Sequence, residues 1–129
     1  MIARQQFKVV MSKHFSKHEF TCPCCGRYIV SNHLMAVLEL IRAEFMRPVH
    51  INSGYRCKKN NEKVGGSKDS KHLLGIAADC HIQGVTPDDI FDFMNMTFPR
   101  CYGVGLYNSW VHIDVRPERA RWRDIDDKK

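Results

Sequence analysis

The sequence contains no apolar run that approaches the roughly 18 residues needed to span a membrane. Its N-terminus, MIARQQFKVV, also lacks the long apolar stretch and the small-residue cleavage site of a secretory signal peptide. No internal repeat, low-complexity stretch or long linker divides the 129 residues. We therefore expect a single monomeric domain over residues 1–129 without membrane insertion, in which residues 1–14 and 119–129 are peripheral.

The charge of the chain is unbalanced toward the positive. Lys and Arg number 20 against 14 Asp and Glu, which gives a formal net charge of +6. Such a charge favours polyanionic surroundings such as nucleic acid, anionic lipid or a bacterial cell wall. The basic C-terminal segment VRPERARWRDIDDKK is interspersed with acidic residues, and no stripe of alternating aromatic and basic residues is present. We therefore expect no nucleic acid partner.

Six cysteines are many for a cytosolic protein, and three of them lie within four positions in FTCPCCGRY. The adjacent Cys24 and Cys25 bond to each other only with strain. One interpretation is a knuckle that holds a structural zinc ion at Cys22, Cys24 and Cys25, completed by Cys57 or Cys101. Because the spacing does not give two CxxC pairs, free thiols or disulfides are the alternative.

Three segments predict helices. The clearest is 31–45, where apolar residues recur at helical spacing after the capping residues SN. A second helix over 87–97 is predicted by Thr86 as cap, followed by proline at the first helical position. A short helix beginning at Ser16 is predicted in SKHEF, because Glu19 stands three residues after the cap.

Short strands are predicted in RPVHINSGY, GIAADCHI, CYGVGLY and SWVHIDV, and the last two are placed to form a hairpin. The order of elements predicts an α+β fold with helices packed on a small, largely antiparallel sheet. In SWVHIDV, a period of two puts Trp110, His112 and Asp114 on one face and three apolar residues on the other. If the apolar face is buried, His112 and Asp114 line a cleft.

The segment SKDSKHLLGIAADCHI places His72 and Asp79 seven residues apart. Zinc ligands of these types lie about 2.0 to 2.2 Å from the ion, so the two side chains would have to converge. A helix would separate them by about 10 Å and an extended chain by more than about 20 Å. Chelation therefore requires a chain reversal, for which Gly75 is suited. A catalytic site needs a third ligand, which His112 offers, although a strand histidine taken alone is more often structural.

Three blocks in order, INSGYRC, NEKVGGSKDSKHLLGIAADC and GVGLYNSWVHIDV, resemble the zinc D-Ala-D-Ala carboxypeptidase family, peptidase family M15. The resemblance runs from about residue 15 to 118. That family shares its metal-site architecture with phage endolysins that cut peptidoglycan stem peptides and with the hedgehog signalling domain. The family pattern S-x-H-x-x-G-x-A-x-D is matched by Ser70, His72, Gly75, Ala77 and Asp79.

The resemblance implies that His72, Asp79 and His112 bind one catalytic Zn²⁺. Arg56 matches an arginine that contacts substrate in related enzymes, and a guanidinium suits a terminal carboxylate. The alternative for Arg56 is a surface salt bridge. Ser70 either hydrogen-bonds substrate or fixes the His72 loop.

The resemblance also implies metal-assisted amide hydrolysis, in which a nearby carboxylate takes a proton from water. Some members carry Glu or Asp three residues before the last histidine ligand, where this chain has Ser109. Asp114 is the remaining carboxylate on the ligand face. It is a candidate catalytic base, or alternatively a partner that orients a histidine.

These features predict a zinc-dependent peptidase that hydrolyses peptide bonds of peptidoglycan stem peptides, either as a D-Ala-D-Ala carboxypeptidase or as an endolysin-type endopeptidase. The expected setting is phage or prophage lysis, in which a protein made in the cytoplasm reaches the cell wall through a phage pore. The alternative is a catalytically inactive zinc-containing module that binds peptidoglycan or protein.

Overall fold

The computed structural model describes residues 12–125. Residues 1–11 and 126–129 lie outside the described residues, and with them most of the N-terminal segment predicted to be peripheral and the end of the C-terminal one. None of the helices in the described range is long and apolar enough to cross a membrane. The elements in chain order are η1 (Lys17–Phe20), α2 (Asn32–Phe45), β1 (His50–Ser53), α3 (Lys58–Lys63), η2 (Lys71–Leu74), β2 (Ala77–His81), α4 (Pro87–Thr97), β3 (Gly103–Tyr107), β4 (Val111–Asp114) and β5 (Ala120–Asp124).

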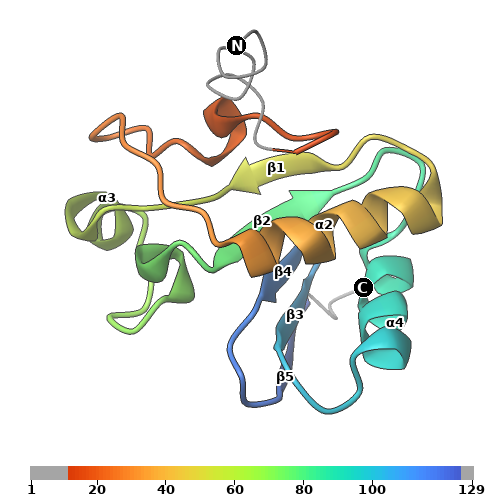
Figure 1. Cartoon of the computed structure of the whole chain (residues 1–129). Coiled ribbons are helices and arrows are strands. Elements are labelled where there is room, and N and C mark those ends of the chain that lie inside the picture. The colour runs from red at the N-terminus through yellow and green to blue at the C-terminus, as the bar shows by residue number, and fades with distance from the viewer. Residues whose placement is uncertain (1–11, 126–129) are drawn as a thin grey trace, which may run out of the picture.

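The strands form one five-stranded sheet in the order β1-β2-β4-β3-β5 (Figure 1). Every neighbouring pair is antiparallel except β3 and β5, which run parallel. The predicted α+β fold with a largely antiparallel sheet is therefore confirmed, and β3 and β4 form the predicted hairpin. The C-terminal segment 119–129 contributes the edge strand β5, which was not predicted as a strand.

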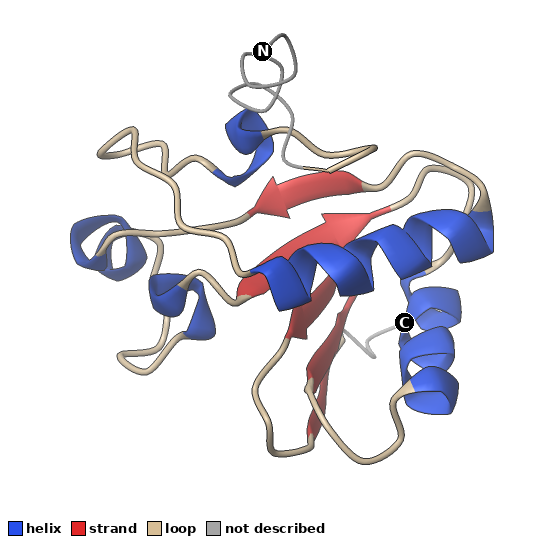
Figure 2. Cartoon of the chain, viewed as in Figure 1, coloured by secondary structure: helices blue, strands red, loops and turns tan. Residues whose placement is uncertain are grey.

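Helix α2 lies across one face of the sheet (Figure 2). It begins where the Ser31 side chain accepts hydrogen bonds from the backbone N–H groups of His33 and Leu34. Its predicted apolar stripe is buried against the strands and α4. The largest fully buried apolar side chains of this core are Phe15, Phe20, Leu34, Leu38, Ile41, Ile90, Met94, Val104, Leu106, Val111 and Ile113.

Helix α4 also follows the prediction. The Thr86 hydroxyl accepts a hydrogen bond from the backbone N–H of Asp89, and Pro87 occupies the first turn. The short η1 begins where the Ser16 N–H donates to the Glu19 carboxylate at 2.9 Å. Helices α3 and η2 were not predicted, because both are short segments of the connection between β1 and β2.

The two faces of the central strands carry different side chains. Ala78 and Cys80 of β2, like Val111 and Ile113 of β4, point into the core beneath α2 and α4. By alternation, Asp79 and His112 lie on the opposite face. The sheet therefore separates its apolar core from the face on which the candidate ligands are presented.

Candidate active site

Asp79 and His112 lie directly opposite each other on the antiparallel strands β2 and β4. Directly opposite side chains in such a pair project side by side from the same face. Oδ1 of Asp79 lies 3.0 Å from Nδ1 of His112. Backbone pairing therefore sets this half of the site.

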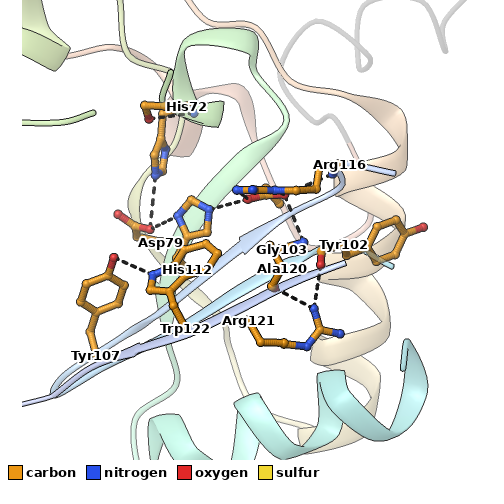
Figure 3. Close-up of polar contacts among 12 residues, drawn as sticks. His72, Asp79, Tyr102, Gly103, Tyr107, His112, Arg116, Ala120, Arg121 and Trp122 are labelled. Carbon is orange, nitrogen blue, oxygen red and sulfur yellow. Dashed lines mark hydrogen bonds and ion pairs between the residues drawn. The ribbon is translucent and has the colours of Figure 1, made fainter. Parts of the chain in front are cut away.

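His72 approaches the same point from η2. The chain turns back at Gly75, which has a left-handed φ of 72°, before β2 begins. This is the reversal that the spacing of His72 and Asp79 requires. The Ser70 hydroxyl accepts a hydrogen bond from the backbone N–H of His72 at 3.2 Å and so fixes the start of the turn. Nε2 of His72 then lies 3.3 Å from Oδ1 of Asp79 (Figure 3).

The ligand atoms of His72, Asp79 and His112 all lie within 4.8 Å of one another. Ligand atoms on one tetrahedral zinc, each about 2.0 to 2.2 Å from it, lie roughly 3.3 Å apart. The other ring nitrogens are engaged elsewhere. Nδ1 of His72 donates to the carbonyl of Gly54 at 2.7 Å, and Nε2 of His112 donates to Asp114 at 2.8 Å. One nitrogen of each histidine is thus left to face the aspartate, and this donor set fits Zn²⁺.

Asp114 lies under His112 and is completely buried. Its carboxylate accepts hydrogen bonds from the His112 ring, from the Arg116 guanidinium at 2.7 and 2.8 Å, and from the backbone N–H of Gly103 at 3.1 Å. It is not among the residues that line the cavity, which differs from the expectation that it lines the cleft beside His112. The reason is local, because Arg116 and Gly103 close over the carboxylate.

The side chains of Asp79, His112 and Asp114 stabilise one another's charges. Burial raises the pKa of the Asp79 carboxyl, but its contacts with His112 and His72 outweigh this effect and lower the pKa well below its usual range. Asp114 shows the same balance, with His112 and Arg116 lowering its pKa. Burial lowers the pKa of His112, whereas Asp114 and Asp79 raise it, and the net shift is upward. Both aspartates are therefore ionised at neutral pH, as anionic partners of a cation.

Arg56 is held beside Asp79. Its guanidinium donates to the hydroxyl of Ser53 at 3.2 Å and to Oδ1 of Asn61 at 2.9 Å, and it lies 3.5 Å from Oδ2 of Asp79. Its backbone N–H donates to the carbonyl of His72. Arg56 is thus tied to the His72 turn and is not a freely solvated surface charge.

These side chains line an open cavity of about 620 Å³. Arg56, Ser70, His72, Asp79 and His112 all contribute to its wall. The structure adds lining residues that the sequence did not single out, among them Asp69, Lys71, Tyr107, Arg116 and Trp122.

Trp122 forms a wall beside His112 (Figure 3). Its ring centroid lies 5.1 Å from that of His112, and its indole N–H donates to the hydroxyl of Tyr107 at 3.1 Å. The ring occupies this position because Gly105, its neighbour on β3, has no side chain. The glycines in GVG, two residues apart, were the available signal for such a close approach.

A family model described as Peptidase M15 matches residues 12–114, a span that includes all three candidate metal ligands. The chain belongs to the peptidase M15 family. This result confirms the family resemblance seen in the sequence.

The M15 chain is also similar to curated relatives. It is 37% identical over 81 residues to the peptidoglycan L,D-endopeptidase MepK of Escherichia coli K12, and the same values hold for MepK of Escherichia coli O157:H7 and of Shigella flexneri. The match covers 57% of this chain and 43% of each relative. The chain therefore spans less than half the length of these relatives.

A second group of metal-ligating side chains lies outside the cavity. The sulfur atoms of Cys22, Cys25 and Cys57 lie within 4.8 Å of one another, whereas Cys24, which the sequence placed in the knuckle, and Cys101 are not part of this group. Burial raises the pKa of the Cys22 thiol, but backbone hydrogen bonds from Cys57, Cys25 and Cys24 outweigh this effect and lower the pKa to about 7. None of the six cysteines is joined in a disulfide in this structure.

Proposed function

We propose that this M15 chain is a zinc-dependent peptidase that hydrolyses a peptide bond in peptidoglycan stem peptides. The observation that carries the proposal is the convergence of His72, Asp79 and His112 on one point in the wall of an open cavity. Membership of the peptidase M15 family and similarity to enzymes named as peptidoglycan endopeptidases support the same conclusion.

His72, Asp79 and His112 would hold the ion. A zinc ion in such a site supplies a Lewis acid that polarises a substrate carbonyl and activates water. The carbonyl of Gly54 and the carboxylate of Asp114 orient the two imidazole rings by accepting a hydrogen bond from the ring nitrogen that does not face the metal. We therefore assign Asp114 a positioning role in place of the catalytic base role, because its carboxylate is buried and fully hydrogen-bonded.

The proton acceptor must then be a group that reaches the cavity. Among the residues that line the cavity, the carboxylates are Asp69 and Asp79, and Asp79 is engaged with the two histidines. Asp69 is exposed, and it is therefore the carboxylate that we propose to take the proton.

Arg56 is suited to bind a substrate carboxylate. Its side chain is held by Ser53 and Asn61, so little conformational freedom is lost when a ligand binds. Lys71 and Arg116 add positive charge to the same cavity, which favours an anionic stem peptide. Recognition of a terminal carboxylate would make the enzyme a carboxypeptidase, whereas recognition of a side-chain carboxylate is compatible with an endopeptidase.

A second candidate function is a zinc-containing module that binds peptidoglycan without cleaving it. The observation that favours it is the lack of a carboxylate at position 109 together with the enclosure of Asp114. Two measurements on wild type and His112→Ala distinguish the peptidase from the binding module. They are the zinc content and the release of soluble peptides from purified peptidoglycan. An active enzyme loses zinc and product release together in the variant, whereas a binding module binds peptidoglycan and releases no product even as wild type.

Mass spectrometry of the products identifies the bond that is cleaved. Release of D-alanine from a stem peptide ending in D-Ala-D-Ala indicates a carboxypeptidase, and the appearance of uncrosslinked fragments from crosslinked material indicates an endopeptidase. A role in phage or prophage lysis stays a prediction. Lysis on co-expression with a pore-forming phage protein, absent with His112→Ala, would support it.

A further inference from the structure

The cysteine-rich segment at residues 22–25 folds against Cys57, which lies 35 positions away from Cys22 in the sequence. We propose that Cys22, Cys25 and Cys57 form a second metal site and supply three ligands of a structural Zn²⁺. This site is distinct from the cavity, since none of its cysteines lines it.

The positions of the sulfur atoms carry the proposal. The three sulfurs lie within 4.8 Å of one another, and two thiolates on one tetrahedral zinc lie about 3.8 Å apart when each Zn–S bond is about 2.3 Å. Side-chain rotations that move the sulfurs by less than about 1 Å would bring them to the S–S separation and the Zn–S bond length of such a site.

The backbone around Cys22 has the form of a metal-binding turn. Cys22 and Cys25 are separated by two residues, a spacing that zinc sites use, and Gly26 follows with a left-handed φ of 75°. The N–H of Cys22 donates to the carbonyl of Arg27 at 2.8 Å, and the N–H of Gly26 donates back to the carbonyl of Cys22 at 2.9 Å. These bonds close the turn with the two sulfurs on one side.

Backbone N–H groups also point at the sulfur atoms. The N–H of Cys57 donates to Sγ of Cys22 at 3.4 Å, and the N–H of Asn60 donates to Sγ of Cys57 at 3.5 Å. Such donors favour the thiolate, which is the form that ligates zinc.

A disulfide explains this arrangement less well. A disulfide uses two sulfurs, whereas three are gathered here. The surrounding core is also small. Cys22 and Cys57 are buried with Tyr55 in a cluster separate from the main core, and residues 21–31 contain neither helix nor strand. A bound metal would stabilise this segment, which has no regular secondary structure of its own.

The proposed site is joined to the active site through residues 53–57. The carbonyl of Gly54 orients the His72 ring, Arg56 enters the cavity, and Cys57 directly follows. The N–H of Tyr55 donates to the carbonyl of Phe20, two residues before Cys22. A metal ion on Cys22 and Cys57 would therefore hold the segment that positions both His72 and Arg56.

Metal content of the full chain, purified under reducing conditions, tests the proposal. We expect two zinc ions per chain in wild type and one in Cys57→Ser, whereas the control Cys101→Ser keeps two. Replacement of zinc by Co²⁺ gives a second readout that requires no variant. Thiolate ligands produce intense near-ultraviolet charge-transfer bands, which the His72, Asp79 and His112 site cannot give because it contains no sulfur.

The two sites can fail independently in this experiment. Suppose that the protein binds one zinc, which is lost in His112→Ala and kept in Cys57→Ser, and that the cobalt protein shows no thiolate band. This result overturns the cysteine site and leaves the peptidase proposal standing. One zinc lost in Cys57→Ser, with the thiolate band present, supports the cysteine site even if the active-site metal is wrong. Mass spectrometry of protein purified without reductant gives a further check. A Cys22–Cys57 disulfide there, together with the absence of the thiolate band, also overturns the cysteine metal site.

Discussion

Asp79 and His112 face each other across β2 and β4, and the same row continues through Gly105 of β3 to Trp122 of β5. Two candidate metal ligands, a glycine without a side chain and an aromatic ring therefore lie next to one another across four strands. The absent side chain at the third position gives the Trp122 ring its place beside His112.

Gly105→Ala is expected to lower both thermal stability and turnover while zinc content is retained. An added Cβ would collide with the indole ring of Trp122 and push it away from His112. Thermal unfolding and peptidoglycan release measure the two effects. In a Trp122→Ala background, Gly105→Ala should lower thermal stability and turnover much less. Strictly additive effects of the two substitutions would show that the Trp122 ring does not mediate these losses.

Asp114→Asn is expected to weaken zinc binding by about 10- to 100-fold, because the carboxylate that orients the His112 ring is lost. Activity should return when excess zinc is added. Zinc titration followed by turnover at saturating zinc checks both statements. If turnover is abolished at saturating zinc with unchanged zinc affinity, Asp114 is the catalytic base after all. Asp69→Asn is the matched change, for which we expect lost turnover and unchanged zinc affinity.

Arg56→Lys is expected to raise KM about 10- to 100-fold for a substrate whose carboxylate binds there. Lysine keeps the positive charge but loses the paired donors that suit a carboxylate. The measurement compares steady-state kinetics on a stem peptide with those on the same peptide in amidated form. A loss of equal size on both substrates would assign Arg56 a purely structural role. Lys68→Gln, a loss of charge outside the cavity, serves as the control.

Gly75→Ala is expected to destabilise the fold and weaken zinc binding. The left-handed φ of 72° costs an alanine about 1 to 2 kcal/mol, and its Cβ would also collide with the backbone of Ile29. Gly65→Ala is a close control, since its φ of 77° is similar but nothing lies within 4 Å of the added atom. Thermal unfolding should therefore show a larger loss of stability for Gly75→Ala than for Gly65→Ala. Equal losses of stability would show that the contact with Ile29 does not contribute.

Glu39 on α2 predicts a pH dependence of stability. Burial raises the pKa of its carboxyl, but hydrogen bonds from Ser12 and His14 outweigh this effect and lower it. A lowered pKa in the folded state contributes stability at neutral pH that is lost as the pH falls below about 4.5. Glu39→Gln should therefore be less stable at neutral pH and lose less stability on acidification. Glu44→Gln, at an exposed position of the same helix, should retain the wild-type pH profile in urea unfolding.

Local signals were sufficient for much of the fold. The spacing of apolar residues and the capping residues predicted α2 and α4, because both depend on neighbours within one or two helical turns. The alternation in SWVHIDV correctly assigned His112 to the face opposite the core. It did not reveal what covers Asp114, since Gly103 reaches that carboxylate from β3, 11 residues away in the sequence.

Strand β5 shows why other parts of the fold were not predicted from the sequence. ARWRD reads as a charged surface segment, yet the charge of Arg121 is accommodated by hydrogen bonds to the carbonyls of Phe98, Cys101 and Tyr102 near the end of α4. These partners are about 20 residues away in the sequence. No local pattern predicts them, and the position of Trp122 depends on them.

The parallel pairing of β5 with β3 also bears on how a shortened protein would behave. A fragment ending at residue 114, where the family match ends, would keep all three candidate ligands and lose the whole of β5. Strand β3, with the apolar sequence GVGLY, would then become an unpaired edge. Such edges recruit strands from other molecules, so this fragment should self-associate and precipitate even though its three candidate metal ligands are present.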